Sequence, residues 1–353
     1  MSRFFTERLS ELKPYTPGEQ PQNRKYIKLN TNESPFPPSP GVRAAVADEA
    51  ETLRLYSDPE SRNLTDVLAA HYHLKPEQIL VGNGSDDLLN FAFLAFCDDK
   101  HPALFPDVTY GFYPVLAQLN RVPFAEIPLK EDLSIQLKDY YGRYGTIFLA
   151  NPNAPTGLFL PPRDIELLLQ ENTERLVVVD EAYVEFGGES VLPMIDSYNN
   201  LLVIHTFSKS HSLAGARLGF AVGNPALIQD MNTLKYSTNP YNVNRMTSAA
   251  GIAALKENDY YQKNAAIIMN NREYTAEALR KLGFTVTDSK ANFLFASTER
   301  INGGSLYQKL KERGILIRHF SLKRIDNWVR ITVGSREEMD ALLKETEEIL
   351  QNC

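Results

Sequence analysis

A lysine with the setting needed for covalent chemistry lies at position 209. It follows an apolar run over residues 201–206 and stands in the sequence Thr-Phe-Ser-Lys-Ser. The run predicts a buried strand, and in open α/β sheets ligands bind beyond the carboxyl ends of the strands. A lysine placed there can lose its proton when it is desolvated and attack a carbonyl carbon, which forms a Schiff base. Most Ser-Lys pairs lie on solvated surface, so Lys209 needs partners to support this chemistry.

A carboxylate and a phenol stand at the end of another apolar run. Residues 176–180 read Leu-Val-Val-Val-Asp, and Tyr183 follows three positions after Asp180. A carboxylate at the end of a buried strand is unfavourable unless it meets a cation. The protonated nitrogen of a pyridine ring would be such a cation, and Tyr183 could reach a phenolic oxygen on the same ring. Taken alone, Asp180 is better explained as the N-cap of a helix.

Two further segments have the residues of a phosphate site. Arg217 lies eight positions after Lys209, and its guanidinium could clamp a phosphate while Ser208 donates a hydrogen bond. Residues 82–87, Gly-Asn-Gly-Ser-Asp-Asp, predict a turn from a strand into a helix whose first backbone N–H groups can bind phosphate. Because Asp87 stands where a dinucleotide-binding motif has its third glycine, a nicotinamide dehydrogenase is disfavoured. The simpler alternative for Arg217 is an ordinary surface arginine.

These segments, in this order, resemble the aspartate-aminotransferase-like enzymes of fold type I, which hold pyridoxal 5′-phosphate (PLP). The loop Asn-Pro-Asn-Ala-Pro-Thr-Gly over residues 151–157 belongs to the same pattern. Within this fold the chain is similar to the histidinol-phosphate aminotransferases. The closer resemblance covers nearly the whole chain and rests on residues 29–35, 56–59, 109–113 and 329–334.

The resemblance implies a role for each matching residue. Lys209 would hold the cofactor as a Schiff base and move a proton between the substrate and the cofactor. Asp180 would keep the ring nitrogen protonated, and Tyr183 would hydrogen-bond the ring's O3′ oxygen, so these three are the expected catalytic residues. The other expected cofactor-binding residues are Gly84, Ser85, Asp86, Tyr110, Asn153, Ser208, Arg217 and, from the neighbouring subunit, Tyr56. The expected substrate-binding residues are Tyr15, Asn32, Arg318 and Arg330.

One position departs from the family pattern. The family usually has an asparagine directly before Pro-Thr-Gly that hydrogen-bonds the O3′ oxygen, and this chain has Ala154. We expect the neighbouring Asn153 to supply the amide instead.

The elements that must position these residues alternate between strands and helices. Such alternation predicts a mainly parallel sheet with right-handed crossovers. The expected fold class is therefore α/β, and the resemblance implies a large domain with a mostly parallel seven-stranded sheet plus a smaller α+β domain. Strands of the large domain are expected at residues 78–81, 103–105, 146–150, 176–180 and 201–206.

We expect three parts along the chain. Residues 1–38, rich in Pro and Asn, predict an extended arm that packs with the small domain and the partner subunit. Residues 39–243 would form the large cofactor-binding domain and residues 244–353 the small one. The small domain is expected to begin with a long helical stretch to about residue 282 and to end in a helix opened by a Ser335–Glu338 capping box.

Composition narrows the classes of function and location. Apolar residues make up 43% of the chain, and its net charge of -7 gives no broad basic face for nucleic acid. The longest apolar run, 88–97, is about half of a membrane span, so no membrane partner is expected. The two cysteines, Cys97 and Cys353, form no disulfide framework, which favours a reducing compartment, and we expect a cytoplasmic protein. His71 and His73 lack acidic or cysteine partners nearby, so no metal is expected.

The resemblance implies an enzyme that transfers the amino group of L-histidinol phosphate to 2-oxoglutarate, giving L-glutamate, in histidine biosynthesis. It also implies an obligate homodimer. Two alternatives share the fold: a PLP decarboxylase of a phosphorylated amino acid, and an aromatic amino-acid aminotransferase. A non-catalytic PLP-binding regulatory module is disfavoured, because Lys209 is present and no basic helix-turn-helix segment precedes the arm.

Overall fold

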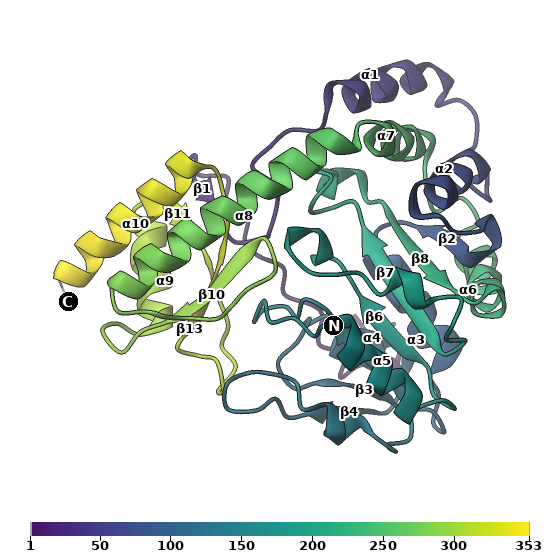
Figure 1. Cartoon of the computed structure of the whole chain (residues 1–353), viewed down its shortest axis with the longest axis horizontal. Helices are drawn as coiled ribbons and strands as arrows, with labels where there is room; N and C mark the ends of the chain where they lie inside the picture. Colours follow the sequence, from purple (N-terminus) through teal and green to yellow (C-terminus); the bar gives the residue numbers. More distant parts are fainter. Residues whose placement is uncertain (1, 353) are drawn as a thin grey trace.

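The computed structural model describes residues 2–352 and is built around a seven-stranded sheet (Figure 1). The strand order is β2-β8-β7-β6-β5-β3-β4, and only β8 runs against its two neighbours, so the predicted mostly parallel sheet is confirmed. Its strands are β2 (Ile79–Gly82), β3 (Ala103–Pro106), β4 (Phe124–Ile127), β5 (Thr146–Ala150), β6 (Val177–Asp180), β7 (Leu201–Thr206) and β8 (Gly219–Gly223).

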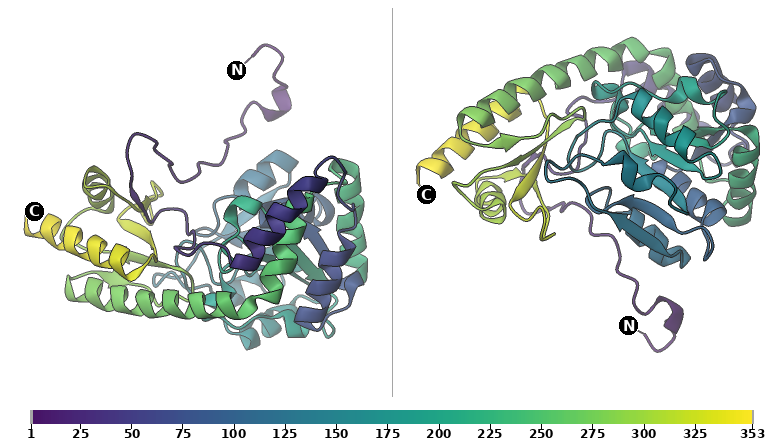
Figure 2. Two further views of the ribbon diagram at one scale, coloured as in Figure 1. Left: turned by 90° about the horizontal axis from the view of Figure 1, so that it is seen from above. Right: turned by 60° about the horizontal axis from the view of Figure 1, so that its bottom comes forward.

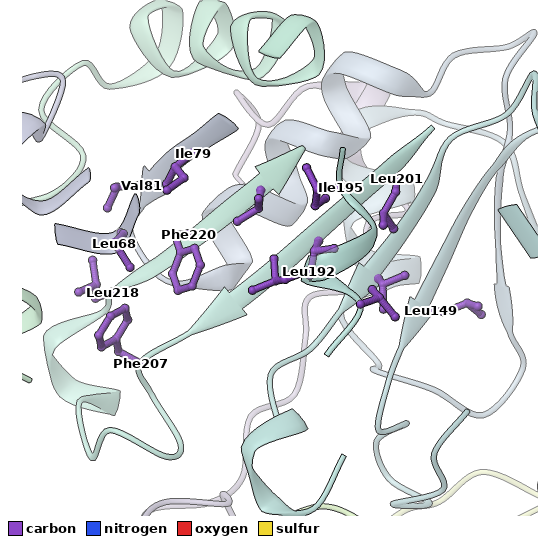
Figure 3. Close-up of a cluster of buried hydrophobic side chains, with 14 of the residues drawn as sticks. Leu68, Ile79, Val81, Leu149, Leu192, Ile195, Leu201, Phe207, Leu218 and Phe220 are labelled. Atoms are coloured by element: carbon purple, nitrogen blue, oxygen red, sulfur yellow. The ribbon is translucent and has the colours of Figure 1, made fainter. Parts of the chain in front are cut away.

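Helices cover both faces of this sheet (Figure 1). Successive strand residues point to opposite faces, so Val177 and Val179 join one core and Val178 joins the other. One face packs against α2 (Arg62–Tyr72), α5 (Pro162–Glu171) and α7 (Arg245–Lys256), and Figure 3 shows this core around Leu149, Leu201 and Phe220. The other face packs against α3 (Ser85–Phe96), α4 (Tyr113–Asn120) and α6 (Pro225–Thr238). Burial on both faces explains why the central strands are apolar along their whole length.

The C-terminal part forms a second, smaller α+β unit. Its antiparallel sheet has the order β12-β13-β10-β9 and a core of its own. The strands of this sheet are β9 (Thr285–Val286), β10 (Phe293–Ser297), β12 (Arg318–His319) and β13 (Trp328–Thr332), and β11 (Ile315–Leu316) lies outside it. The helices of the unit are α8 (Asn258–Lys281), α9 (Gly303–Glu312) and α10 (Arg336–Gln351). The predicted capping box is present, because Ser335 Oγ accepts from the Glu338 backbone N–H while the Glu338 carboxylate accepts from that of Ser335.

The N-terminal segment joins the small unit through one short strand. β1 (Ile27–Lys28) pairs in parallel with β11. The first described residues extend away from the rest of the chain (Figure 2), whereas Thr16 and Pro17 accept hydrogen bonds from Arg318. After it the chain enters α1 (Pro40–Glu49). No described helix is long and apolar enough to cross a membrane.

The long helical stretch predicted from residue 244 is divided in two. It breaks at Glu257, whose carboxylate accepts the backbone N–H of Gly41 at 3.0 Å. Ala250 and Ala254 of α7 belong to the large-domain core, whereas α8 continues along the small unit (Figure 1). The division at residues 1–38, 39–243 and 244–353 stays a proposal, and this packing favours placing the second boundary within α8.

Candidate active site

A cavity of about 230 Å³ opens where the three central strands β5, β6 and β7 end. Their last residues, Ala150, Asp180 and Thr206, all line it. Neighbouring parallel strands end at the same edge of a sheet, so segments far apart in sequence meet there. The predicted site residues that line the cavity are Tyr15, Asn32, Ser85, Asp86, Tyr110, Asp180, Tyr183, Ser208, Lys209, Arg217, Arg318 and Arg330.

Lys209 presents its amino group to this cavity. Its Nζ lies 3.4 Å from the backbone oxygen of Thr31, to which it donates, and 5.7 Å from the centre of the Tyr183 ring. Of the lysines within residues 2–352, Lys209 alone lines the cavity. It is therefore the lysine able to form a Schiff base with a bound carbonyl compound.

Asp180 lies at the end of β6 and is 4% exposed. Its Oδ1 accepts the backbone N–H of Ala182 at 3.1 Å, and its Oδ2 accepts the hydroxyl of Tyr113 at 3.2 Å. Burial raises the pKa of the Asp180 carboxyl to about 6, and the hydrogen bonds from Ala182 and Tyr113 and the charge of His205 offset this only in part. No lysine or arginine of the described chain forms an ion pair with Asp180. A cationic ring nitrogen bound in the cavity would supply the missing positive charge.

Tyr113 was not predicted as part of the site, although it belongs to the 109–113 segment that carries the resemblance. It is fully buried at the start of α4. Its hydroxyl donates to Asp180, which lies on a strand 67 positions later in the chain. No local pattern joins the two positions, so only the fold shows the contact.

A phosphate could bind where α3 begins. Arg217 donates from Nη2 to Asp86 Oδ2 at 3.0 Å and from Nη1 to Ser208 Oγ at 3.4 Å. Tyr110 donates to the other oxygen of Asp86 at 2.8 Å, so Asp86 positions Arg217 and Tyr110. Gly84, which does not line the cavity, has φ +80°, and a Cβ there would lie 2.6 Å from Arg217 Nη2. The glycine therefore lets the guanidinium approach the helix N-terminus, where free N–H groups also attract anions.

A second group of cations comes from the small unit. Arg318 and Arg330 are register partners on β12 and β13, and neither forms an ion pair with a carboxylate among residues 2–352. Arg330 donates from Nη2 to the Asn30 oxygen at 3.1 Å, while its Nε is buried without a hydrogen-bond partner. Burial lowers the pKa of the Arg330 guanidinium. An anion bound in the cavity would raise this pKa again, because it stabilises the charged guanidinium.

The same wall contains arm residues and an aromatic ring that was not predicted. Arg318 donates to the Thr16 and Pro17 oxygens at 2.8 and 3.0 Å and so fixes the arm beside the cavity. Tyr15, brought in by this segment, lies with its ring centre 6.1 Å from that of Tyr110. The Phe320 ring centre is 5.5 Å from Arg318 Cζ and 5.7 Å from Arg330 Cζ, so both guanidinium groups flank it.

Asn153 does not line the cavity. Its Nδ2 donates to the Val108 oxygen and to Thr156 Oγ1, both at 3.0 Å, and its Oδ1 accepts from Thr109 at 2.7 Å. Both amide hydrogens hold the loop together and neither points to the cavity. Asn153 therefore does not reach the cavity in this structure, where the wall at this loop is Ala154.

Tyr56 also lies outside the cavity. Its side chain is 80% exposed, and its ring stacks on Tyr241 with centres 4.6 Å apart. A role in a cofactor site therefore requires a site on another subunit.

Comparison with known proteins agrees with this geometry. Residues 24–345 match the family of class I and II aminotransferases. The chain is 45% identical over 354 aligned positions to a histidinol-phosphate aminotransferase of Brachyspira hyodysenteriae, with full coverage of both chains. It is 46% identical to histidinol-phosphate aminotransferase 2 of Burkholderia lata, covering 99% of this chain and 100% of that one.

A solved structure also superimposes along the whole chain. It is the histidinol-phosphate aminotransferase of Sinorhizobium meliloti in complex with pyridoxal-5′-phosphate. The TM-score is 0.91 at 26% identity, covering 100% of this chain and 99% of that one. The family match, the fold and the full-length relatives all indicate the same family. The chain belongs to the class I and II aminotransferases and, within them, to the histidinol-phosphate aminotransferase family.

Proposed function

We propose that the chain is a PLP-dependent aminotransferase that moves the amino group of L-histidinol phosphate to 2-oxoglutarate, in histidine biosynthesis. One observation carries the proposal. A single cavity joins two anion-binding arginines, Arg217 and Arg330, to the amine of Lys209 and the buried carboxylate of Asp180. The full-length relatives at 45% and 46% identity support the same substrate.

The residues present fit PLP. The phosphate would bind at the N-terminus of α3 with Arg217 and Ser208, where Gly84 leaves room for the guanidinium. The ring nitrogen would face Asp180, a buried carboxylate with a raised pKa that forms no ion pair with a described lysine or arginine. When bound, the cofactor's ring accepts the electrons released as the substrate loses its Cα proton.

Lys209 has two tasks in this proposal. Its Nζ would hold the cofactor and would move a proton from the substrate's Cα to the cofactor side. The Thr31 oxygen, 3.4 Å away, accepts from Nζ and keeps the amine beside the Tyr183 ring. A protonated ring nitrogen beside Asp180 would keep this carboxylate ionised, which burial alone opposes.

Arg330 would serve both half-reactions. The substrates have a phosphate in one case and carboxylates in the other, and a guanidinium can bind either in a two-pronged arrangement. Arg330 has an unpartnered Nε for this purpose. Tyr15 and Arg318 tie the arm to the same wall, so the arm would cover the bound substrate and exclude water.

We also propose that the enzyme is a homodimer with shared sites. Leu53, Leu55 and Tyr56 expose large apolar side chains on one segment, and Tyr56 is outside the cavity of its own chain. A second subunit would cover this segment and receive Tyr56 at its phosphate site. The expected cytoplasmic location stays a prediction.

The decarboxylase alternative has weaker support. A phosphothreonine decarboxylase of Porphyromonas gingivalis is similar at 22% identity with a TM-score of 0.82, which indicates a shared fold alone.

A panel of amino donors with 2-oxoglutarate tests the function, with glutamate formation as the readout. Histidinol phosphate should be preferred over phenylalanine. Release of carbon dioxide without glutamate would favour a decarboxylase. Equal kcat/KM for histidinol phosphate and phenylalanine would overturn the substrate assignment.

A further inference from the structure

We propose that Asn32 is a positioning residue for the cofactor, in place of the amide missing at position 154. It would orient the hydroxyl of Tyr183 so that this hydroxyl donates its proton to the cofactor's phenolic oxygen. The proposal rests on the proposed function, since it concerns how PLP is held.

The hydrogen bonds of Asn32 fix which way its amide points. Thr332 Oγ1 accepts the backbone N–H of Asn32 at 2.9 Å and donates to Asn32 Oδ1 at 3.0 Å. This leaves Nδ2 facing Tyr183, whose hydroxyl oxygen lies 2.9 Å away. Because an NH₂ group can only donate, Tyr183 must accept in this contact. The proton of Tyr183 is then free for a second partner in the cavity.

The position of Asn32 is held from several sides. The residue is 1% exposed, and its φ of 57° is left-handed, a conformation that asparagine tolerates better than most residues. Asn292 Nδ2 donates to its backbone oxygen at 3.0 Å. Asn32 therefore presents a rigid donor to Tyr183.

The loop that usually supplies the amide offers none here. Ala154 packs with Phe293 against the Tyr183 ring and has no polar side-chain atom. Asn153 uses its amide within the loop. The donor to the phenolic oxygen would therefore be Tyr183 itself, with its direction set by Asn32.

This arrangement has a measurable chemical effect. A hydrogen bond from Tyr183 to the phenolic oxygen withdraws negative charge from it. The oxygen would then hold a proton at the Lys209 nitrogen less strongly. The pH at which the visible absorption band of the bound cofactor changes should therefore be low in the wild type. Losing one hydrogen bond to a charged group costs about 1.5–3 kcal/mol, so removing it should raise that pH by roughly 1–2.

Two substitutions of Asn32 remove its amide donor while keeping its backbone conformation. Asn32→Gly removes the amide and suits the left-handed φ. Asn32→Asp keeps an acceptor for Thr332 but places an oxygen where Nδ2 donates, so the Tyr183 proton turns toward it. Spectra of the purified PLP-bound protein, titrated with pH, should give a raised midpoint for both, with Asn32→Asp at least as high as Asn32→Gly.

The control is Tyr183→Phe, alone and combined with each change. If Asn32 acts through Tyr183, the double variants should match Tyr183→Phe, because the effects of coupled residues do not add. Unchanged midpoints in both Asn32 variants, or full additional shifts in the Tyr183→Phe background, would overturn the inference. A wild-type protein that holds PLP without any pH-dependent band would overturn the inference, and a protein that holds no PLP would overturn the proposed function as well.

Discussion

The hydroxyl of Tyr113 lies 3.2 Å from Asp180 Oδ2, and among the described residues Tyr113 is the side chain that donates a hydrogen bond to this buried carboxylate. One neutral donor and one backbone N–H leave most of the charge of Asp180 uncompensated. A cation bound beside this carboxylate would stabilise it, whereas without such a cation the buried charge destabilises the fold.

Asp180→Asn should have opposite effects with and without cofactor. The pKa of Asp180 is raised from 3.8 to about 6 by burial, so the cofactor-free protein is destabilised as pH rises through this range and fully so above it. Removing the charge should stabilise the cofactor-free protein near pH 7 by up to about 3 kcal/mol. Tyr113 can accept from the new amide.

Urea unfolding of the cofactor-free proteins checks this prediction. The difference between Asp180→Asn and wild type should vanish below about pH 4, where both states are protonated. With PLP the same substitution should weaken cofactor retention. If Asp180→Asn destabilises the cofactor-free protein equally at pH 7 and below about pH 4, the carboxylate of Asp180 does not carry an uncompensated charge.

His205→Gln should destabilise the protein strongly at neutral pH. His205 Nε2 lies 2.8 Å from Glu181 Oε2, both side chains are buried, and the pKa of His205 is raised to about 10, where hydrogen bonds to Glu181 outweigh desolvation. Its charge therefore stabilises the fold fully below pH 6.5, and the contribution is lost as pH rises toward 10. Removing one partner of a buried pair costs about 3–5 kcal/mol.

His211→Gln is the matched control, read by urea unfolding between pH 6 and 10. His211 is also buried, but burial lowers its pKa to about 4, so it is neutral in this range. His211→Gln should lower the free energy of unfolding by an amount that does not change with pH above pH 7. The same pH profile for both variants would contradict an ionised His205.

Gly84→Ala should weaken cofactor binding. A methyl group there would lie 2.6 Å from Arg217 Nη2 and force the guanidinium away from the N-terminus of α3. Gly142→Ala is the control, because Gly142 also has positive φ, at +65°, but meets nothing within 4 Å. Both should lose about 1–2 kcal/mol of stability from backbone strain, and Gly84→Ala alone should show a raised Kd for PLP. Equal PLP affinity in the two variants would contradict the role of Gly84.

Arg330→Ala and Arg318→Ala should differ in which half-reaction they impair. Arg330 has a free Nε and should matter for histidinol phosphate and for glutamate, with a roughly ten- to hundred-fold loss in kcat/KM. Arg318 is bonded to the arm, so its loss should impair histidinol phosphate more than glutamate. Steady-state kinetics with both amino donors checks this, and equal losses for Arg318→Ala would argue against a selective role.

Mixing Tyr56→Ala with Lys209→Ala subunits should restore activity. In a mixed dimer one site receives both defects and the other is intact, so random mixing should give roughly a quarter of the wild-type activity. Activity assays on mixtures whose mixed dimers are verified by mass check this. No recovery in such mixtures would contradict a shared site.

The sequence predicted five of the seven strands of the large sheet, including the edge strand β2, and missed β4 and β8. β5, β6 and β7 are apolar throughout because both faces are covered, whereas β4 is an edge strand with exposed Phe124 and was not predicted. β8 was also missed, since its ends are glycines. A Cβ on Gly219 would lie 2.7 Å from the backbone of Ser85. That requirement comes from packing against the turn before α3 and has no local pattern.

The site shows the same difference between local and distant relations. Residues that end strands, such as Asp180, or follow them closely, such as Lys209, could be predicted because the strand positions them. Asn153 was expected to face a cofactor from its residue type, but its amide hydrogens are used by Val108 and Thr156. The partnership of Asn32 with Tyr183 spans 151 positions, so only the folded chain brings it about.

Three consecutive residues of the N-terminal segment each contact a different functional side chain. Asn30 accepts from Arg330, Thr31 accepts from Lys209, and Asn32 donates to Tyr183. These three side chains, Arg330, Lys209 and Tyr183, come from distant segments of the chain. The spacing of consecutive residues in the tripeptide therefore fixes how far apart they lie in the cavity. Deleting a single residue here would shift these contacts together, although the three residues themselves belong to none of the large hydrophobic cores. Such a deletion should therefore impair the roles of Arg330, Lys209 and Tyr183 together.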